Sequence, residues 1–524
     1  MHEKNKSRKE FHMKRILTIA LALVMLVSVI SLFACAQGTD SKTTTVGGDT
    51  ANPTTNNNDY DHALDSKDFG GQEITFVFAE GANDNFTQRS IKVEEEGGNE
   101  VNKKIMERNE YVERTLNISI VSQQADGGIA DLRGTVENSL AAGSGDYDVI
   151  TGYQYFDIGL ALEGWLVNLN RPELYGIDGI LDLTKGYWAQ YYNENLRAGA
   201  GDNAARYWIT GDLSLRYIGG MYVTYVNQRI YDDIIKPIDG DIYDIAFNGQ
   251  WTLDKLAEFA SKCWVDNGDV PEQPDKGDQL GFIWESGNDN IDGLAFGSQI
   301  PFSTKYADGS IKITLNDNRT TSFLQKIDPL FHSNYSYCET EGDDSRVRMQ
   351  QFASGNVAFV IGHIKHAEMW LTEMTDGYYI LPTPKLNEEQ ADYVTGVHDG
   401  CSIFGIAWDS NNKEAAACAL EIMAAKSLEL VTPTYYESAV KFKYTRDSNS
   451  AIVIENLVRK HVETDFAAVW SNNISDVAHF FRSNNTSKGI SNTIKRSVTS
   501  YQAKLDELVE KFAQLREDEN ELAA

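Results

Sequence analysis

Basic residues are scarce in this chain relative to acidic ones. It has 47 Lys and Arg against 77 Asp and Glu, which gives a formal net charge of −30. Such a field repels phosphate backbones, so we do not expect nucleic-acid binding. The sequence also has no G-x-x-x-x-G-K-[ST] loop and no H-E-x-x-H pair, the usual patterns for nucleotide phosphates and catalytic zinc. We read the acidity as a means of solubility in an exposed environment.

Cysteine is also rare, with five residues in 524. Cys35 stands near the N-terminus, and Cys263, Cys338, Cys401 and Cys418 are spread over the remainder. None belongs to a C-x-x-C pair, so neither a zinc site nor a thioredoxin-like centre is indicated. The four later cysteines allow three pairings; we expect buried free thiols, with one disulfide left open. No cofactor is implied.

The one long apolar run lies at the N-terminus, from Ile16 to Phe33. Basic residues precede it, and Ala34-Cys35 follow it. This arrangement resembles the lipobox of bacterial lipoproteins, which implies a signal peptide over residues 1–34 and lipidation of Cys35. The alternative is an uncleaved membrane anchor with an incidental cysteine. Met13 could be the true start, because the basic residues after it supply an adequate n-region.

A polar segment separates this run from the main body of the chain. Residues 35–67 are rich in Thr, Asn, Gly, Ser and Asp, with runs such as Thr43-Thr44-Thr45. Such a composition cannot bury enough apolar surface to order itself, so we predict a disordered tether. About 460 residues then remain, too many for one hydrophobic core, and we expect two lobes.

The start of the body alternates between strand and helix patterns. We predict strands at 73–78, 118–121 and 147–153, and helices at 100–113 and 131–142. Strand, helix and strand joined by short connections predict a parallel sheet with right-handed crossovers. Ligands of such sheets bind at the carboxyl ends of the strands, which makes Tyr153 and Gln154 candidate site residues.

Several later segments form an ordered set that spans most of residues 70–440. One is a tyrosine-rich strand ending at Asn227, then a short helix, then Trp251-Thr252 opening another helix that Thr252 would cap. The other segments are Gly164-Trp165-Leu166, Phe352 to Val360, Leu381-Pro382-Thr383-Pro384, and Ser402 to Ile406 with Asn411 to Ala416. Taken in order, these segments resemble ABC-transporter extracellular solute-binding proteins of the sugar-binding type (family 1).

The resemblance implies an α/β fold of two lobes, like that of periplasmic binding proteins. It implies a first lobe of residues 68–224 with 385–432 and a second of 225–384 with 433–524. The crossing strands would lie near Tyr222–Asn227, Leu381–Pro384 and Val431–Thr434. The ligand would lie in the cleft between the lobes, which close around it. Past residue 498, apolar residues at helical spacing from Tyr501 to Leu515, Val509 among them, predict a core-facing helix stripe.

A sugar cleft should offer aromatic faces to the rings and carboxylates or amides to the hydroxyls. We expect the ligand-binding residues in loops beside predicted strand ends. Trp284 could equally be packed in the core, and His363 could equally lie in a surface loop without contacting a ligand. The candidates are Tyr153, Gln154, Asp212, Trp284, Asn288, His363 and Asp399.

Two acidic loops partly resemble calcium sites. Residues 288–293 fit the start of an EF-hand, but the twelfth position would be Gln299 instead of a bidentate glutamate. Asp266 to Asp269 with Asp278 resembles a degraded calcium loop. We favour solvated turns at both places and predict no metal ligand.

The function that the resemblance implies is capture of a small solute, an oligosaccharide by family, and its delivery to the permease of an ABC transporter. The protein would be a monomer, held by its lipid on the extracellular face of the cell membrane. We expect no enzymatic activity. The alternatives are a surface-anchored glycan-active enzyme, for which no carboxylate pair gives specific support, and a ligand-sensing or adhesion module sharing the fold.

Overall fold

Two main β-sheets, each flanked by helices, make up the body of the protein. The computed structural model describes residues 58–81, 84–95, 97–201, 204–267, 270–315, 318–340, 346–439 and 448–522. All of them belong to one contact unit, which spans residues 56–524. The predicted signal peptide, Cys35 and the tether up to residue 57 lie outside the described residues.

The first sheet has the strand order β11-β3-β1-β2. Strands β1 (Gln72–Phe78), β2 (Ile118–Gln124) and β3 (Val149–Tyr153) are parallel, and β11 (Ser402–Ile406) pairs antiparallel with β3. Helices α3 (Glu100–Leu116) and α4 (Leu132–Ala142) connect the parallel strands. The parallel sheet predicted from the strand and helix patterns is therefore confirmed.

The second sheet has the order β10-β4-β9-β5-β8. Strand β4 (Tyr222–Asn227) runs antiparallel to β9 (Val357–His363) and β10 (Tyr378–Pro382). Strand β5 (Leu280–Glu285) runs parallel to both β9 and β8 (Ser336–Glu339). All three of β5, β8 and β9 therefore end at the same edge. A separate hairpin joins β6 (Ser303–Lys305) to β7 (Ile311–Ile313).

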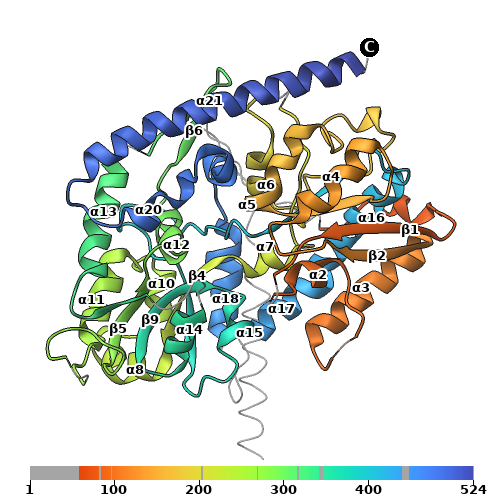
Figure 1. Cartoon of the computed structure of the whole chain (residues 1–524). Helices are drawn as coiled ribbons and strands as arrows, with labels where there is room; N and C mark the ends of the chain where they lie inside the picture. The colour runs from red at the N-terminus through yellow and green to blue at the C-terminus, as the bar shows by residue number, and fades with distance from the viewer. Residues whose placement is uncertain are drawn as a thin grey trace, which may run out of the picture. The chain divides into compact units, whose positions relative to one another are not determined.

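Helices cover the two sheets (Figure 1). Helix α11 begins at its predicted cap, where Thr252 Oγ1 accepts from the Lys255 N–H at 3.2 Å. Helix α8 begins at Asn227, whose Oδ1 accepts from the Ile230 N–H at 3.1 Å. Besides α3 and α4, the described α-helices are α2 (Phe86–Ile91), α5 (Gln154–Asp157), α6 (Gln190–Leu196), α7 (Leu215–Gly219), α8 (Gln228–Ile234), α9 (Lys236–Asp239), α10 (Ile242–Phe247), α11 (Leu253–Cys263), α12 (Asn290–Gly297), α13 (Asn318–Phe331), α14 (Arg346–Ala353), α15 (His366–Trp370), α16 (Lys413–Lys426), α17 (Thr432–Ala439), α18 (Ser448–Val453), α19 (Phe466–Val469), α20 (Phe480–Ser483) and α21 (Ile490–Leu522).

The chain enters the second sheet before Tyr222 and not within residues 222–227, because β4 pairs with its neighbours along its whole length. It returns to the first sheet through the connection between β10 and β11. The third expected crossing, Val431–Thr434, is helical: it joins the turn Ser427–Val431 to α17. The predicted lobe boundaries stay a prediction, because residues 56–524 form a single contact unit.

The folded body also begins earlier than residue 68. Residues His62–Ser66 form a short 3₁₀ helix that Asp61 caps. Tyr60 and Leu64 are buried in the cluster that covers one face of the first sheet, together with the alanines of α16. The prediction therefore placed the end of the tether too late, because the buried side chains of Tyr60 and Leu64 anchor this segment to the body.

The last helix, α21, contacts both halves of the body and runs along the top of Figure 1. Gln502 accepts a hydrogen bond from the Ile313 N–H in the β6–β7 hairpin, at 2.9 Å. Near the other end, Glu519 accepts from the hydroxyl of Tyr207 at 2.7 Å and from Asn168 at 2.8 Å, beside the first sheet. The predicted apolar stripe is buried at Leu505, Leu508 and Phe512, whereas Val509 is exposed.

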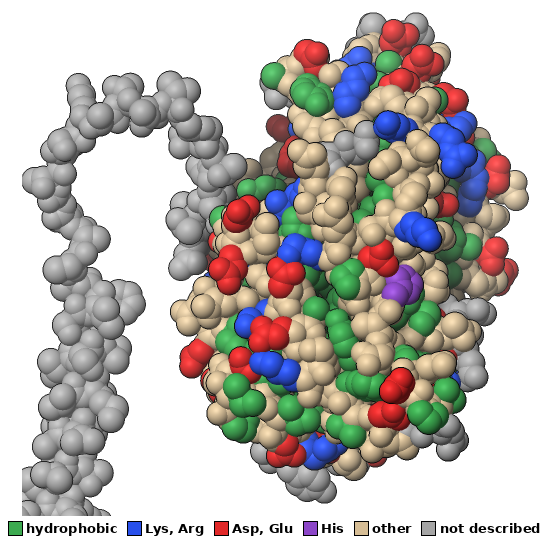
Figure 2. Space-filling view, turned by 90° about the vertical axis from the view of Figure 1, so that its left-hand side faces the viewer, with side chains coloured by type: hydrophobic (Ala, Val, Ile, Leu, Met, Phe, Trp, Pro, Cys, Tyr) green, Lys and Arg blue, Asp and Glu red, His purple; other side chains and the backbone are tan. Residues whose placement is uncertain are grey.

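Charges are distributed and not gathered on the face that Figure 2 shows, where acidic and basic side chains are interspersed with apolar ones. The four later cysteines are all free, and burial raises the pKa of the Cys263, Cys401 and Cys418 thiols to about 12. Among the described helices, none combines the length and apolarity needed to span a bilayer.

Replacement of Phe512 tests whether α21 belongs to the core. Its ring packs edge-on against Trp470 at 4.9 Å between centroids, so Phe512→Ala should lower the free energy of unfolding by about 3–5 kcal/mol. Val509→Ala, on the exposed side of the same helix, should change it by less than about 0.5 kcal/mol. Chemical denaturation measures both; equal small effects would mean that the helix is not packed as described.

Candidate ligand-binding cavity

A cavity of about 550 Å³ lies where the strand ends of the two sheets meet. From the first sheet, Asp84 follows β1, Ile129 follows β2, and Tyr153 ends β3. From the second, Asn288 and Asp289 follow β5, and His363 ends β9. The carboxyl ends of parallel strands are the usual place for a ligand in an α/β sheet, and here both sheets supply them.

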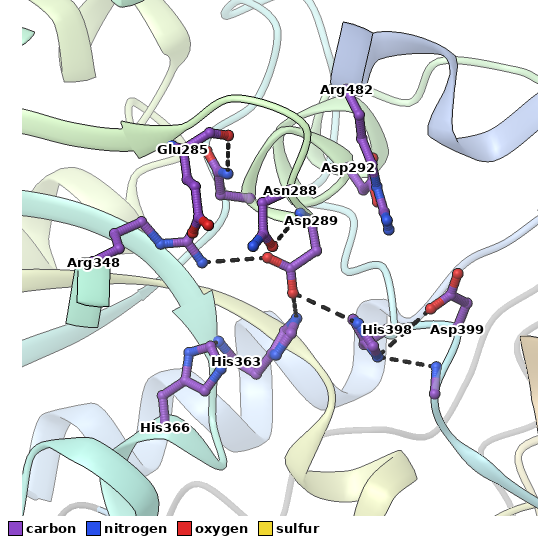
Figure 3. A network of polar contacts seen from close by, with 12 residues as sticks. Glu285, Asn288, Asp289, Asp292, Arg348, His363, His366, His398, Asp399 and Arg482 are labelled. Atoms are coloured by element: carbon purple, nitrogen blue, oxygen red, sulfur yellow. Dashed lines mark hydrogen bonds and ion pairs between the residues drawn. The ribbon is translucent and has the colours of Figure 1, made fainter. Parts of the chain in front are cut away.

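Asp289 is the centre of the polar wall on the second-sheet side (Figure 3). Its Oδ1 faces Arg348 Nη2 at 3.3 Å, while its Oδ2 lies 3.2 Å from His363 Nε2 and 3.6 Å from His398 Nε2. Burial alone would raise the pKa of Asp289, but Arg348 and the surrounding histidines hold it well below its usual range. The carboxylate is therefore ionised at neutral pH.

The histidines of this wall are neutral at pH 7. Burial is the main cause that lowers the pKa of His398, to about 4, and that lowers the pKa values of His363 and His366. His366 Nδ1 accepts from the His363 backbone N–H at 3.1 Å, and His398 Nδ1 accepts from the Gly400 N–H at 2.9 Å. These backbone bonds fix both rings.

On the first-sheet side, Tyr153 is held by a buried arginine. The guanidinium of Arg216 lies 5.1 Å from the centre of the Tyr153 ring, and it pairs with Glu80 and Asp84 at 2.7 Å each. Burial raises the pKa of Asp84, yet Arg216 and Lys365 outweigh that effect and leave it lowered. The wall therefore presents an ionised carboxylate beside a fixed aromatic ring.

The remaining wall adds cations and a tryptophan. Lys365 and Trp370 come from the segment after β9, and Arg482 comes from α20. Arg482 pairs with the buried Asp292 at 2.8 Å from its Nε. Lys365 Nζ lies 5.9 Å from the centre of the Phe86 ring, and no hydrogen bond from it to the described residues is found. The cavity thus combines two aromatic side chains with positive and negative groups.

Of the predicted ligand-binding residues, the structure brings four to this region. Tyr153, Asn288 and His363 line the cavity. Asp399 lies beside it, 3.6 Å from His398 Nδ1 and 2.6 Å from His479 Nε2. His363 is fully buried at a strand end, so it does not lie on a surface loop.

The other three predicted residues lie inside the protein. Gln154 bonds to the Val469 carbonyl and to Tyr192, and Asp212 forms a bidentate pair with Arg459 at 2.7 and 2.8 Å. Trp284 stacks on Phe331 at 4.3 Å between ring centroids and donates its Nε1–H to the Phe331 carbonyl. Both faces of β5 are covered, so the core interpretation of Trp284 holds, and we assign all three residues structural roles.

Sequence reasoning missed Lys365, Trp370, His398 and Arg482. Only His398 carried a signal, its position directly before Asp399. Lys365 lies in the turn after β9, and Trp370 and Arg482 lie in α15 and α20; no local pattern shows how close these segments come to β5. In the second acidic loop, the carboxylate of Asp278 accepts from the N–H groups of Asn267 and Asp275, as in a turn. Residues 268 and 269 of that loop lie outside the described residues.

The fold is that of the substrate-binding proteins of ABC transporters. The chain aligns over 83% of its length with 99% of an ABC substrate-binding protein from Listeria monocytogenes in complex with cycloalternan, at 12% identity and a TM-score of 0.51. It is similar to a solute-binding protein from Thermotoga lettingae bound with alpha-D-tagatose (14% identity, 83% and 100% of the chains, 0.51). It is also similar to a Rhizobium etli sugar transporter in an open conformation, at 13% identity over 83% of this chain and 99% of that one, with a TM-score of 0.52. No family model and no curated protein sequence matches the chain.

Asp157, which supports Tyr153 from below, should make stability depend on pH. Its Oδ2 accepts from the Tyr153 N–H at 2.7 Å, and burial raises its pKa to about 7, against about 3.9 in an unfolded chain. The folded protein then holds the extra proton between pH 4 and 7, so its contribution to stability falls as pH rises through that window. This difference between the folded and unfolded pKa values corresponds to a loss of roughly 4 kcal/mol in the free energy of unfolding.

The variant Asp157→Asn keeps the acceptor for the Tyr153 N–H but cannot ionise. It should be more stable than wild type at pH 8 and equal to it at pH 4, as measured by urea unfolding at several pH values. Asp178→Asn, which changes an exposed carboxylate, should show no such trend. A stability difference for Asp157→Asn that stays constant from pH 4 to 8 would contradict this assignment.

Proposed function

We propose that the protein is an extracellular solute-binding lipoprotein that captures a carbohydrate in this cavity and delivers it to an ABC permease. The observation that carries the proposal is the cavity's position between the strand ends of two sheets linked by crossing segments. In a two-lobed protein, rotation of the lobes about such crossings opens and closes the cavity. The sugars bound in two of the similar structures, cycloalternan and alpha-D-tagatose, support the same solute class.

The side chains of the cavity suit a sugar. Tyr153 and Trp370 line the cavity with aromatic rings, and the C–H face of a pyranose packs on such rings. Asn288, Asp84 and Lys365 offer donors and acceptors for hydroxyl groups. The mixture of a few directed polar groups with aromatic surface is typical of a small-molecule pocket.

The N-terminal pattern supports attachment to the membrane. Two acyl chains on Cys35 would hold the protein stably at the outer surface, where one chain gives only reversible binding. The polar residues after Cys35 would then set the distance of the folded body, as a monomer, from its permease.

A glycan-active enzyme is less well supported by the charge states of the cavity. A glycosidase needs one protonated carboxyl group beside the bond that breaks. Among the described residues that line the cavity, the two carboxylates are Asp84 and Asp289, and the pKa of each is lowered. Neither would hold a proton at neutral pH, so we propose binding without turnover.

Replacement of Trp370 tests the binding proposal. The protein is first screened by thermal shift against a panel of sugars and oligosaccharides, and the stabilising compound is then titrated calorimetrically. Loss of an aromatic anchor costs about 2 kcal/mol, so Trp370→Ala should weaken binding roughly thirtyfold. The exposed Trp408 supplies the control Trp408→Ala, which should bind as wild type. Repeated hydrolysis of a bound oligosaccharide would overturn the proposal.

Replacement of Cys35 tests the anchor. Cells grown with a labelled fatty acid should incorporate the label into wild type but not into Cys35→Ala, because no thiol remains to be acylated. The free thiol of Cys338, which is partly exposed, gives the control Cys338→Ala, and that variant should still be labelled. Label on Cys35→Ala would refute lipidation at this residue.

A further inference from the structure

Three potential metal ligands converge in the wall of the cavity. The carboxylate of Asp289 and the imidazoles of His363 and His398 each place one ligand atom within 4.8 Å of the other two. They come from three separate segments: the loop after β5, the end of β9, and the connection between β10 and β11. Figure 3 shows both rings directed at the same carboxylate oxygen, Oδ2.

The spacing of these atoms fits a single small ion. A tetrahedral ion with bonds of about 2.0–2.1 Å separates its ligand atoms by about 3.3 Å. Asp289 Oδ2 lies 3.2 Å from His363 Nε2 and 3.6 Å from His398 Nε2. Arg348 lies at the other carboxylate oxygen, Oδ1, at 3.3 Å.

His363 supplies an independent observation. Its side chain is only 2% exposed, and neither of its ring nitrogens makes a hydrogen bond within the described part of the chain. A buried polar group without such a partner costs stability. A cation bound at Nε2 would remove that cost.

We propose that Asp289 Oδ2, His363 Nε2 and His398 Nε2 bind one divalent transition-metal ion. Two imidazoles and one carboxylate favour zinc, and three protein ligands leave a fourth coordination position open. Because His363 and His398 both line the cavity, that open position faces the space assigned to the solute. Binding of the ion itself does not require the proposed sugar function.

The second ring nitrogen of His398 has to change its partner. The Gly400 N–H donates to Nδ1 in this conformation, so the proton of the neutral ring lies on Nε2. When the ion takes Nε2, this proton moves to Nδ1, and the Gly400 bond is given up. The new Nδ1–H then donates a hydrogen bond to Asp399 Oδ1, 3.6 Å away, as metal-bound histidines commonly do to a carboxylate. Asp399 is thus a positioning residue.

Zinc titration of the full chain tests the site. After removal of bound metal with a chelator and dialysis, calorimetry with zinc chloride in the absence of any sugar should show one ion per chain. The variants His363→Gln and His398→Gln should each bind zinc at least tenfold more weakly. His332→Gln, which changes an exposed histidine outside the cluster, should bind as wild type. Asp399→Asn should keep the stoichiometry but lose about 10–100-fold in affinity.

A second measurement separates the site from general damage. Cobalt in place of zinc should give the intense visible absorption of a four-coordinate ion, and that band should disappear in His398→Gln, whose partly exposed side chain is the safer one to change. Thermal melting without metal establishes that each variant is folded. The proposal is overturned if wild type takes up no zinc, or if folded His363→Gln and His398→Gln bind it unchanged. Failure of sugar binding with zinc binding intact would count against the proposed function alone.

Discussion

A buried ion pair between Asp212 and Arg459 fixes the place where the chain leaves the first sheet. The pair is bidentate, and Thr432 donates a third bond to the same carboxylate at 2.6 Å. Asp212 lies just before α7, Thr432 opens α17, and Arg459 belongs to a later turn, so three distant segments meet at one carboxylate. Two charges taken out of water are tolerated only when their hydrogen bonds are complete. The path from α7 into β4, and with it the cavity wall beyond, depends on this geometry.

The sequence predicted the elements of the first sheet within a few residues. Strands 73–78 and 147–153 and helix 100–113 follow patterns that a few neighbouring residues determine, and their caps are local as well. Burial partners are not local. Trp284 was a candidate ligand-binding residue, with core packing equally open, and its position inside β5, between β8 and β9, puts it in the core. Asp212, another predicted ligand-binding residue, is buried, and its partner Arg459 is 247 residues away.

The candidate site shows the same division. Tyr153, Asn288 and His363 were found because residues at strand ends meet at the edge of a sheet, and that rule needs only the order of elements. His398, Lys365 and Trp370 come from connections whose course depends on tertiary packing. Asp289, His363 and His398 come from three separate segments, and their spacing along the chain does not predict that they meet. The acidic loop 288–293 partly resembles a calcium site in sequence. In the structure, Asp289 faces nitrogen atoms of Arg348, His363 and His398, and Asp292 pairs with Arg482.

Helix α21 is attached to both halves of the body. Its 33 residues extend about 50 Å at 1.5 Å per residue, and it is fastened near the hairpin by Gln502 and beside the first sheet by Glu519. A rod attached at both ends does not stretch. If the lobes open as we propose, they must rotate about an axis close to this helix or break one of its two attachments. The range of the opening motion would then be set by a segment that lies outside the cavity.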